Sequence, residues 1–563
     1  MTIPNLLNRG IQTFNQGDIA LAIKSFEKVL SIDRNNADAC RMIGIIALKQ
    51  GKPRRAVEYF LRAIKALPDN DQLYASLGDA YLSLGDECKA VESFEQSVTL
   101  NPDVPQVLNN LANTLKNQSK FDQAIKHLQH AINLQPDLAL LYFNLGNVYR
   151  LTEQNNKAVQ CYLQAISINP QFSESYNNLG NALRDLGDAA SIEHYQKALA
   201  LNPGYIDASF NLASTFELQG DRAQALRYYQ MAYKLDPDNL EISTARCHLE
   251  QYSCNWKAVA VLLGKIVSQI SSKNFPPEAL LGAPFKLISM TNDMAVNLIV
   301  AQQKANQIQA KAKSLHPGFC PQKKKQDNRK FKIGYISGDF FNFATLHLSI
   351  GIFRNHDKND FEVYGYAYGP SDGSSYRKDF VRYCDHFTEV NHLNDAEVAL
   401  QVHKDDLDIL IDLKGHTVEH RLGICALRPA PVQISYLAYP ATTGAEFFDY
   451  VIADETVLPP EHARFYREKP LYVQGSYLAT DDEQVISNKI YTREMFQLPQ
   501  DAFVFSSFNQ PYKIDQKRFY LWMSILKKVP DSILWLMVYL PDARKNILDA
   551  ASEYGIDPAR ICF

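Results

Sequence analysis

Residues 173–205, SESYNNLGNALRDLGDAASIEHYQKALALNPGY, describe two short amphipathic helices joined by a tight turn. Apolar or small residues recur at helical spacing, first at Tyr176, Leu179, Gly180 and Leu183, then at Tyr195, Ala198 and Leu199. Gly187 and Asp188 supply the turn, and Asn202-Pro203 ends the second helix because proline cannot continue it. The stretch therefore predicts a helix-turn-helix unit.

The same unit recurs along the first half of the chain. Prolines fall at positions 68, 102, 136, 170, 203 and 237, at intervals of 34, 34, 34, 33 and 34 residues. This period is that of a tetratricopeptide repeat, and about seven repeats fit residues 5–239. Stacked repeats bury only contacts between neighbours and build an α-solenoid with a long concave groove. We therefore expect residues 1–239 to form such a superhelix.

A row of asparagines follows the repeat. Asn110, Asn144, Asn178 and Asn211 each stand just before the repeat leucine, or its equivalent, at spacings of 34, 34 and 33. Each amide offers a donor and an acceptor, which suits the backbone of an extended peptide. Solvated helix positions that simply tolerate asparagine are the alternative. We favour a sequence-tolerant peptide groove, because asparagine is a mediocre helix former.

From residue 331 the pattern changes to short apolar strands that alternate with helices. Strands are expected at 331–337, 361–368, 407–415, 432–440 and 450–454. A second group comprises strands at 503–509, 532–538 and 560–563, with helices at 513–530 and 542–555. The alternation is typical of parallel α/β sheets, whose ligands bind at the carboxyl ends of the strands. It predicts one Rossmann-like lobe over 331–495 and a partial second lobe over 496–563, after transitional helices and a basic linker at 240–330.

Composition narrows the classes of partner. The chain has 46% hydrophobic and 21% charged residues and a net charge of −4, which gives no reason to expect nucleic acid as a partner. No apolar run is long enough to cross a membrane, and the nine cysteines and scattered histidines show no metal-binding spacing. We expect a cytoplasmic protein without membrane contact, metal or cofactor. The run Lys323–Lys325 is interpreted as a solvated loop.

Three motifs carry a family resemblance. They are SGDFFN followed by ATLHL at 337–348, ALRPAPVQISYLAYPATTG at 426–444, and FNQPYKI at 508–514. Together with the repeats, they resemble the protein O-linked N-acetylglucosamine transferases of glycosyltransferase family 41, including the bacterial and SPINDLY-like members. The resemblance implies a GT-B fold of two Rossmann-like lobes. It also implies metal-independent, inverting transfer of a sugar from a UDP-sugar, such as UDP-N-acetylglucosamine, to Ser or Thr of proteins bound in the repeat groove.

The resemblance also assigns residues. Lys513 matches the family lysine that neutralises the leaving diphosphate, and Gln510 matches a nucleotide contact. Leu437 and Pro440 match positions that line the sugar pocket. Asp339, Asn342 and Thr345 match a loop that contacts the donor.

Two departures from the family lead to further expectations. Phe343 stands where the family has a histidine, and residues 274–282 contain no histidine where the family's proposed general base should fall. The family's second lobe continues with a loop that holds pyrophosphate and ribose, and residues 496–563 end before it. We therefore expect residues 1–563 alone to be weakly active or inactive.

Two alternatives stay open. One is a non-catalytic scaffold that binds polypeptides through its repeats and keeps a degenerate transferase domain. The other is a protein N-glucosyltransferase that acts on asparagine, although such relatives lack a regular repeat array.

Overall fold

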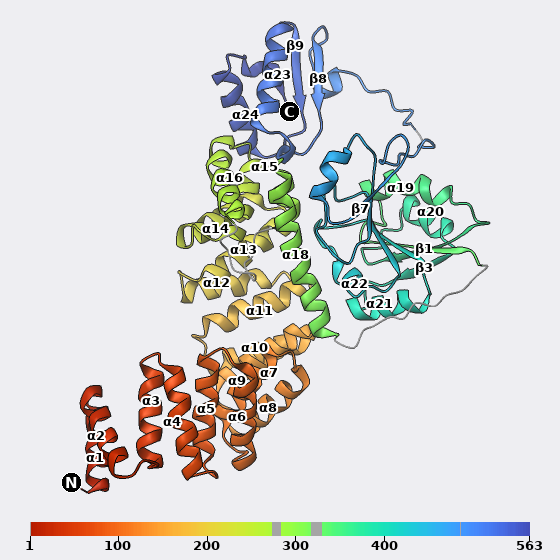
Figure 1. Ribbon diagram of the computed structural model, residues 1–563. Coiled ribbons are helices and arrows are strands. Elements are labelled where there is room, and N and C mark those ends of the chain that lie inside the picture. Colours follow the sequence, from red (N-terminus) through yellow and green to blue (C-terminus); the bar gives the residue numbers. More distant parts are fainter. Residues whose placement is uncertain (1, 273–282, 317–328, 485) are drawn as a thin grey trace. The chain divides into compact units, whose positions relative to one another are not determined.

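The computed structural model describes residues 2–272, 283–316, 329–484 and 486–563 (Figure 1). It divides into two compact units, Met1–Thr215 and Phe216–Phe563. The segment at 274–282 and the run Lys323–Lys325, both singled out in the sequence, lie outside the described residues.

Helices in antiparallel pairs make up the first unit (Figure 1). The bounds are α1 (Ile3–Asn15), α2 (Ile19–Ile32), α3 (Ala37–Lys49), α4 (Pro53–Ala66), α5 (Asp71–Ser83), α6 (Glu87–Leu100), α7 (Pro105–Asn117), α8 (Phe121–Leu134), α9 (Ala139–Leu151), α10 (Asn155–Ile168), α11 (Ser173–Asp185) and α12 (Ser191–Leu201). With α13 (Ile206–Leu218) and α14 (Arg222–Leu235), the chain forms seven helix pairs over residues 3–235. The predicted α-solenoid is confirmed.

A glycine in the first helix of most repeats explains the close packing within a pair. A Cβ atom built on Gly44 would lie 2.6 Å from the ring of Phe60, and one on Gly78 would lie 2.6 Å from the ring of Phe94. Both rings are completely buried. In these repeats a residue without a side chain lets the paired helices approach this closely. Their packing therefore combines a glycine in one helix with a large ring in the other.

Between the repeats and the first sheet, the described residues form four more helices. They are α15 (Leu240–Tyr252), α16 (Trp256–Ser271), α17 (Pro284–Ile288) and α18 (Met294–Leu315). They share a core that includes Val259, Ile266 and Val300. α18 continues beyond it and places Ala305 and Ala312 in the core of the following sheet. The region predicted as transitional is thus well packed over its described helices.

The first lobe is a sheet of seven parallel strands in the order β3-β2-β1-β4-β5-β6-β7. The strands are β1 (Phe331–Ser337), β2 (Phe361–Ala367), β3 (His386–Glu389), β4 (Ile409–Asp412), β5 (Val432–Ser435), β6 (Tyr450–Ala453) and β7 (Lys469–Tyr472). The helices are α19 (Ala344–Arg354), α20 (Ser375–Tyr383), α21 (Asp395–Lys404) and α22 (Leu422–Ala426), with a 3₁₀ turn at Pro460–Phe465. Separate hydrophobic cores cover the two faces of the sheet, as a parallel sheet requires. β3 and β7 were not among the expected strands.

The second lobe contains three parallel strands in the order β10-β9-β8. Its elements are β8 (Phe503–Ser507), α23 (Gln516–Lys528), β9 (Ser532–Leu536), α24 (Pro541–Glu553) and β10 (Ile561–Cys562), with 3₁₀ turns at Glu494–Phe496, Pro511–Lys513 and Pro558–Arg560. Cys254 and Trp256, at the turn between α15 and α16, belong to its hydrophobic core. The expected helix at 513–530 begins three residues later, because Lys513 lies in the 3₁₀ turn.

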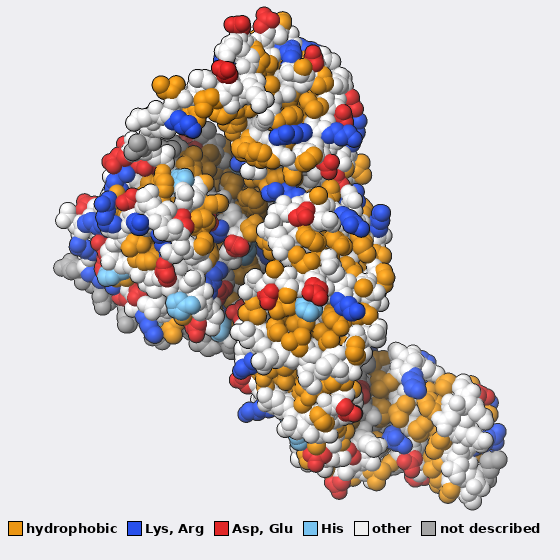
Figure 2. Space-filling model, turned by 180° about the vertical axis from the view of Figure 1, so that it is seen from behind, with side chains coloured by type: hydrophobic (Ala, Val, Ile, Leu, Met, Phe, Trp, Pro, Cys, Tyr) orange, Lys and Arg blue, Asp and Glu red, His pale blue; other side chains and the backbone are white. Residues whose placement is uncertain are grey.

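The visible surface is of mixed charge. On the face that Figure 2 shows, basic and acidic side chains are interspersed over the repeats. Among the described helices, none has both the length and the hydropathy that a membrane-spanning segment requires.

Candidate functional site

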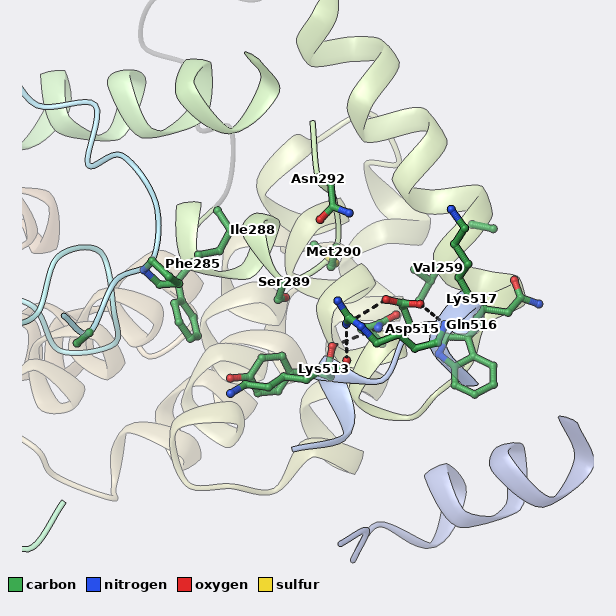
Figure 3. A pocket seen from close by; sticks show the side chains of 17 residues that line it. Val259, Phe285, Ile288, Ser289, Met290, Asn292, Lys513, Asp515, Gln516 and Lys517 are labelled. Atoms are coloured by element: carbon green, nitrogen blue, oxygen red, sulfur yellow. Dashed lines mark hydrogen bonds and ion pairs between the residues drawn. The ribbon is translucent and has the colours of Figure 1, made fainter. Parts of the chain in front are cut away.

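A cavity of about 690 Å³ lies in the second unit and brings together residues from three parts of the chain. α15 to α17 and the loop behind them supply Trp256, Phe285 and Ser289, the loop after β5 supplies Pro440, and the loop after β8 supplies Lys513. Figure 3 shows Lys513 and the residues that follow it on one wall, with Phe285, Ile288 and Ser289 coming from another element. Two of the predicted site residues, Lys513 and Pro440, therefore face the same space.

Positive charge gathers on the second-lobe side of this cavity. Lys513, Lys517 and Arg518 all line it. Arg518 is paired with Asp515 at 3.1 Å, whereas no hydrogen bond or ion pair of the Lys513 or Lys517 ammonium occurs among the described residues. The first turn of α23 lies here, and the N-terminal end of a helix carries partial positive charge. This wall is suited to an anion.

The loop with Pro440 is fixed by a buried carboxylate that the sequence gave no means of identifying. Glu468 is 2% exposed and accepts hydrogen bonds from Thr442 Oγ1 at 2.6 Å, from the Thr443 backbone N–H at 2.6 Å and from the Thr443 hydroxyl. Gly444 follows at φ +67°, and a Cβ atom there would lie 2.3 Å from the backbone nitrogen of Gln302 on α18. The loop is therefore held from both sides.

Leu437 does not line the cavity. Its side chain is 8% exposed and belongs to the core of the first lobe, while its φ of +77° is unusual for a residue other than glycine. The backbone turn at Leu437 instead directs the following residues, Ala438 and Pro440, to the cavity wall. The side chain of Leu437 lies in the core and not at the cavity, so its position does not support the predicted sugar contact.

Asp339 and Thr345 meet at the switch point of the first sheet. β1 pairs with β2 on one side and β4 on the other, so the crevice at the carboxyl ends lies between β1 and β4. There Asp339 Oδ1 lies 2.5 Å from Lys414 Nζ, and Thr345 Oγ1 donates to Asp339 Oδ2 at 2.9 Å. All three residues are buried, with Asp339 4% and Lys414 8% exposed. Sequence analysis missed Lys414, whose only signal was its place at the end of a strand.

The exposed part of the same loop carries Asn342 and Phe343. Asn342 Oδ1 lies 2.7 Å from His347 Nε2, and its backbone N–H donates to Asp372 at 2.8 Å. Phe343, 46% exposed, packs beside Phe341 with ring centroids 5.3 Å apart. The side chain at the position of the family histidine is therefore ordered by an aromatic neighbour and has no polar atom to offer.

Two buried groups at the end of β4 and in the loop after it have shifted pKa values. Burial raises the pKa of Asp412 to about 6, although the backbone N–H groups of Lys414 and Gly415 donate to its carboxylate. Burial lowers the pKa of His416 to about 4, and its Nε2 lies 2.7 Å from the Thr443 carbonyl oxygen. Near neutral pH the imidazole is uncharged and donates through Nε2. His416 thus has a structural hydrogen bond, as expected for an isolated histidine.

In the first unit, the asparagine row makes contacts from repeat to repeat. The side-chain amides of Asn110, Asn144, Asn178 and Asn211 donate to Asp79, Asn109, Asn147 and Asn177 at 3.1, 2.7, 2.8 and 3.0 Å, respectively. Asn144 is 7% exposed, so it has little surface to offer a peptide. The row is therefore a ladder between repeats, and its predicted use as a peptide groove stays a prediction.

The remaining predicted contact, Gln510, is exposed at the start of the 3₁₀ turn, three residues before Lys513, and does not line the cavity. Over the described ranges, no group of three or more His, Cys, Asp or Glu side chains is placed to hold a metal ion.

Family models match most of the chain. Residues 287–490 and 478–563 match glycosyl transferase family 41, and residues 14–36, 41–105, 103–171 and 171–238 match tetratricopeptide repeats. An O-GlcNAc transferase structure from Thermobaculum terrenum is 21% identical, with a TM-score of 0.45, over 75% of this chain and 73% of that one.

Curated relatives point the same way. A probable UDP-N-acetylglucosamine–peptide N-acetylglucosaminyltransferase SEC of Arabidopsis thaliana is 31% identical over 331 residues, which cover 56% of this chain and 34% of that protein. The UDP-N-acetylglucosamine–peptide N-acetylglucosaminyltransferase of Caenorhabditis elegans is 26% identical. The match covers 42% of this chain and 30% of that protein. The chain thus spans about a third of the curated relatives it matches. By the family-model matches, residues 287–563 form a glycosyl transferase family 41 domain, preceded by tetratricopeptide repeats.

Proposed function

We propose that the chain is part of a protein O-glycosyltransferase that moves N-acetylglucosamine from UDP-N-acetylglucosamine to Ser or Thr hydroxyls with inversion. The observation that carries this proposal is the cavity into which both Lys513 and Pro440 face, in a family 41 sequence. The relatives named above carry the transfer of N-acetylglucosamine from UDP-N-acetylglucosamine to a peptide in their names. The four-part division at 239, 330 and 495 and a cytoplasmic location remain part of the proposal.

Lys513 would act on the leaving group. As the glycosidic bond breaks, negative charge builds on the β-phosphate, and an ammonium beside it stabilises the transition state more than the bound substrate. A lysine already engaged in an ion pair would have to give that pair up. Lys513 is without such a partner among the described residues, which suits this role.

The other residues predicted to bind the sugar donor would act in two ways. Gln510 and Asn342 are exposed at the carboxyl ends of β8 and β1, where direct contact with the nucleotide sugar is open to them. Asp339 and Thr345 are buried and bonded to each other, so they would act by fixing the shape of their loop. Acceptor proteins would lie along the repeats and contact the half-buried members of the asparagine row, Asn110, Asn178 and Asn211.

Titration calorimetry of the chain with UDP and UMP tests the proposal. UMP keeps the base, ribose and α-phosphate but lacks the β-phosphate that Lys513 would contact. We expect Lys513→Ala to weaken UDP binding at least tenfold, roughly the effect of a charge-assisted hydrogen bond, and to change UMP binding little. The matched control is Lys528→Ala, which removes an exposed lysine from the opposite end of α23.

Equal affinity for UDP in the Lys513→Ala and unmodified chains would contradict the role of Lys513. A folded chain that binds neither nucleotide would favour the second candidate, a polypeptide-binding scaffold. Phe343 favours this scaffold candidate, because its side chain can neither donate nor accept a hydrogen bond and cannot carry a proton.

A further inference from the structure

The Lys513 loop, residues 508–515, is bonded to a helix hairpin about 260 residues earlier in the chain. Within the loop, the Lys513 backbone N–H donates to the Gln510 carbonyl at 2.9 Å. The carbonyls on either side of Lys513, those of Tyr512 and Ile514, accept from outside the lobe. The side-chain amide of Gln251, at the end of α15, donates to both of them at 3.2 Å.

Trp256, at the start of α16, completes this contact. Its indole N–H donates to the Ile514 carbonyl at 2.9 Å, and its ring lies 5.0 Å from that of Phe519 on α23. Gln251 is 3% and Trp256 6% exposed. A carbonyl buried in such a place without a donor would cost free energy, so these bonds are hard to exchange for water.

We propose that Gln251 and Trp256 are positioning residues that hold the Lys513 loop so that its ammonium faces the cavity. This inference rests on the proposed role of Lys513. A single amide fixes the backbone both before and after Lys513, and the indole fixes it a second time. A lysine on a fixed backbone loses less conformational freedom when it binds an anion, which favours binding and catalysis alike.

A purely structural role of the hairpin is the alternative, since Cys254 and Trp256 belong to the core of the second lobe. The chain offers a control that separates the two. Asn546 on α24 donates to the Ser253 carbonyl at 2.8 Å, so it joins the same hairpin to the same lobe without touching the Lys513 loop. Loss of either amide removes a contact between hairpin and lobe, but only Gln251 is bonded beside Lys513.

The experiment compares Gln251→Met with Asn546→Ala in the full chain, by titration with UDP and UMP and by thermal melting. Methionine keeps the length of glutamine and removes the donor. For Gln251→Met we expect about a tenfold loss of UDP affinity with little change for UMP, because the misplaced group is the one that meets the β-phosphate. Asn546→Ala should leave the ratio of UDP to UMP affinity unchanged, whatever it does to the melting temperature.

An unchanged ratio in Gln251→Met, with the unmodified chain binding UDP, would overturn this inference and leave the role of Lys513 intact. An equal loss of UDP and UMP affinity would also overturn the inference, because a general disturbance of the cavity would weaken both nucleotides alike. If Gln251→Met does not fold, Trp256→Phe provides the same test, because it keeps an aromatic ring in the core and removes the indole donor. An unmodified chain that binds neither nucleotide overturns the proposed function itself.

Discussion

The two loops that leave the first strand of each sheet use their charges in opposite ways. After β1, Asp339 is buried and paired with Lys414 at 2.5 Å. After β8, Lys513 is exposed and has no ion pair among the described residues. In the first loop the charge is used within the protein, whereas in the second it faces the cavity, as the proposed role of Lys513 requires.

The largest expected effect distinguishes the two lysines by stability. Lys414→Met leaves the Asp339 carboxylate buried without a cation, and removal of one partner of a buried pair costs about 3–5 kcal/mol. Lys513→Met breaks no such pair and should change stability by less than about 0.5 kcal/mol. Urea unfolding measures the stability change of each variant. Hydrogen exchange in β1 and β4 reports on the first lobe, and hydrogen exchange in β8 reports on the second. Equal losses for the two variants would remove the contrast.

A smaller effect depends on pH. His416 has a pKa of about 4 when folded against 6.5 when unfolded, so the unfolded chain binds the proton first. The contribution of His416 to the stability of the first lobe should therefore fall as the pH drops from 6.5 towards 4, by roughly 3 kcal/mol. Asp412, whose pKa burial raises to about 6, contributes in the opposite direction over the same range. His416→Gln should remove this contribution to the slope of stability with pH and leave those of Asp412 and of His420, whose pKa burial lowers to about 3. The exposed His392→Gln is the control, and an unchanged slope in His416→Gln would show that the imidazole is not buried as described.

The smallest expected effect is that of Phe343→His. The position is 46% exposed, and the new imidazole would restore the residue type of the family without any of its partners in place. We expect UDP affinity to stay within about twofold and sugar transfer to an acceptor protein to remain undetected. Calorimetry and a transfer assay with labelled donor check this. A clear gain in either would mean that the side chain at position 343 itself acts on the donor, in addition to any contact that Asn342 makes.

The repeats and the central strands could be predicted because their signals are local. A period of 34 residues and apolar runs such as FKIGYIS need only neighbouring residues to be recognised. β3, with sequence HFTE, and β7, with KPLY, escaped because they are four-residue edge strands whose side chains are largely exposed.

The supporting residues of the site could not be predicted for a related reason. Lys414 meets Asp339 across 75 residues of chain, Glu468 meets Thr443 across 25, and Gln251 meets Tyr512 across 261. No short motif connects such partners. The family motifs led to Lys513 and Pro440, which face the cavity, but also to Leu437, whose side chain is in the core. A motif identifies the position along the chain, and the backbone turn there decides where the side chain points.

α18 has a consequence for how this transferase region can be divided. Its first half shares a core with α15 and α16 through Val296 and Val300, and its second half shares a core with the first sheet through Ala305 and Ala312. A fragment begun at the first strand, residue 331, would lack Ala305 and Ala312 from the core on that face of the sheet. A first lobe that keeps this core complete therefore starts no later than Ala305. Gene fusions or domain exchanges that respect the sheet but cut this helix should yield aggregating proteins.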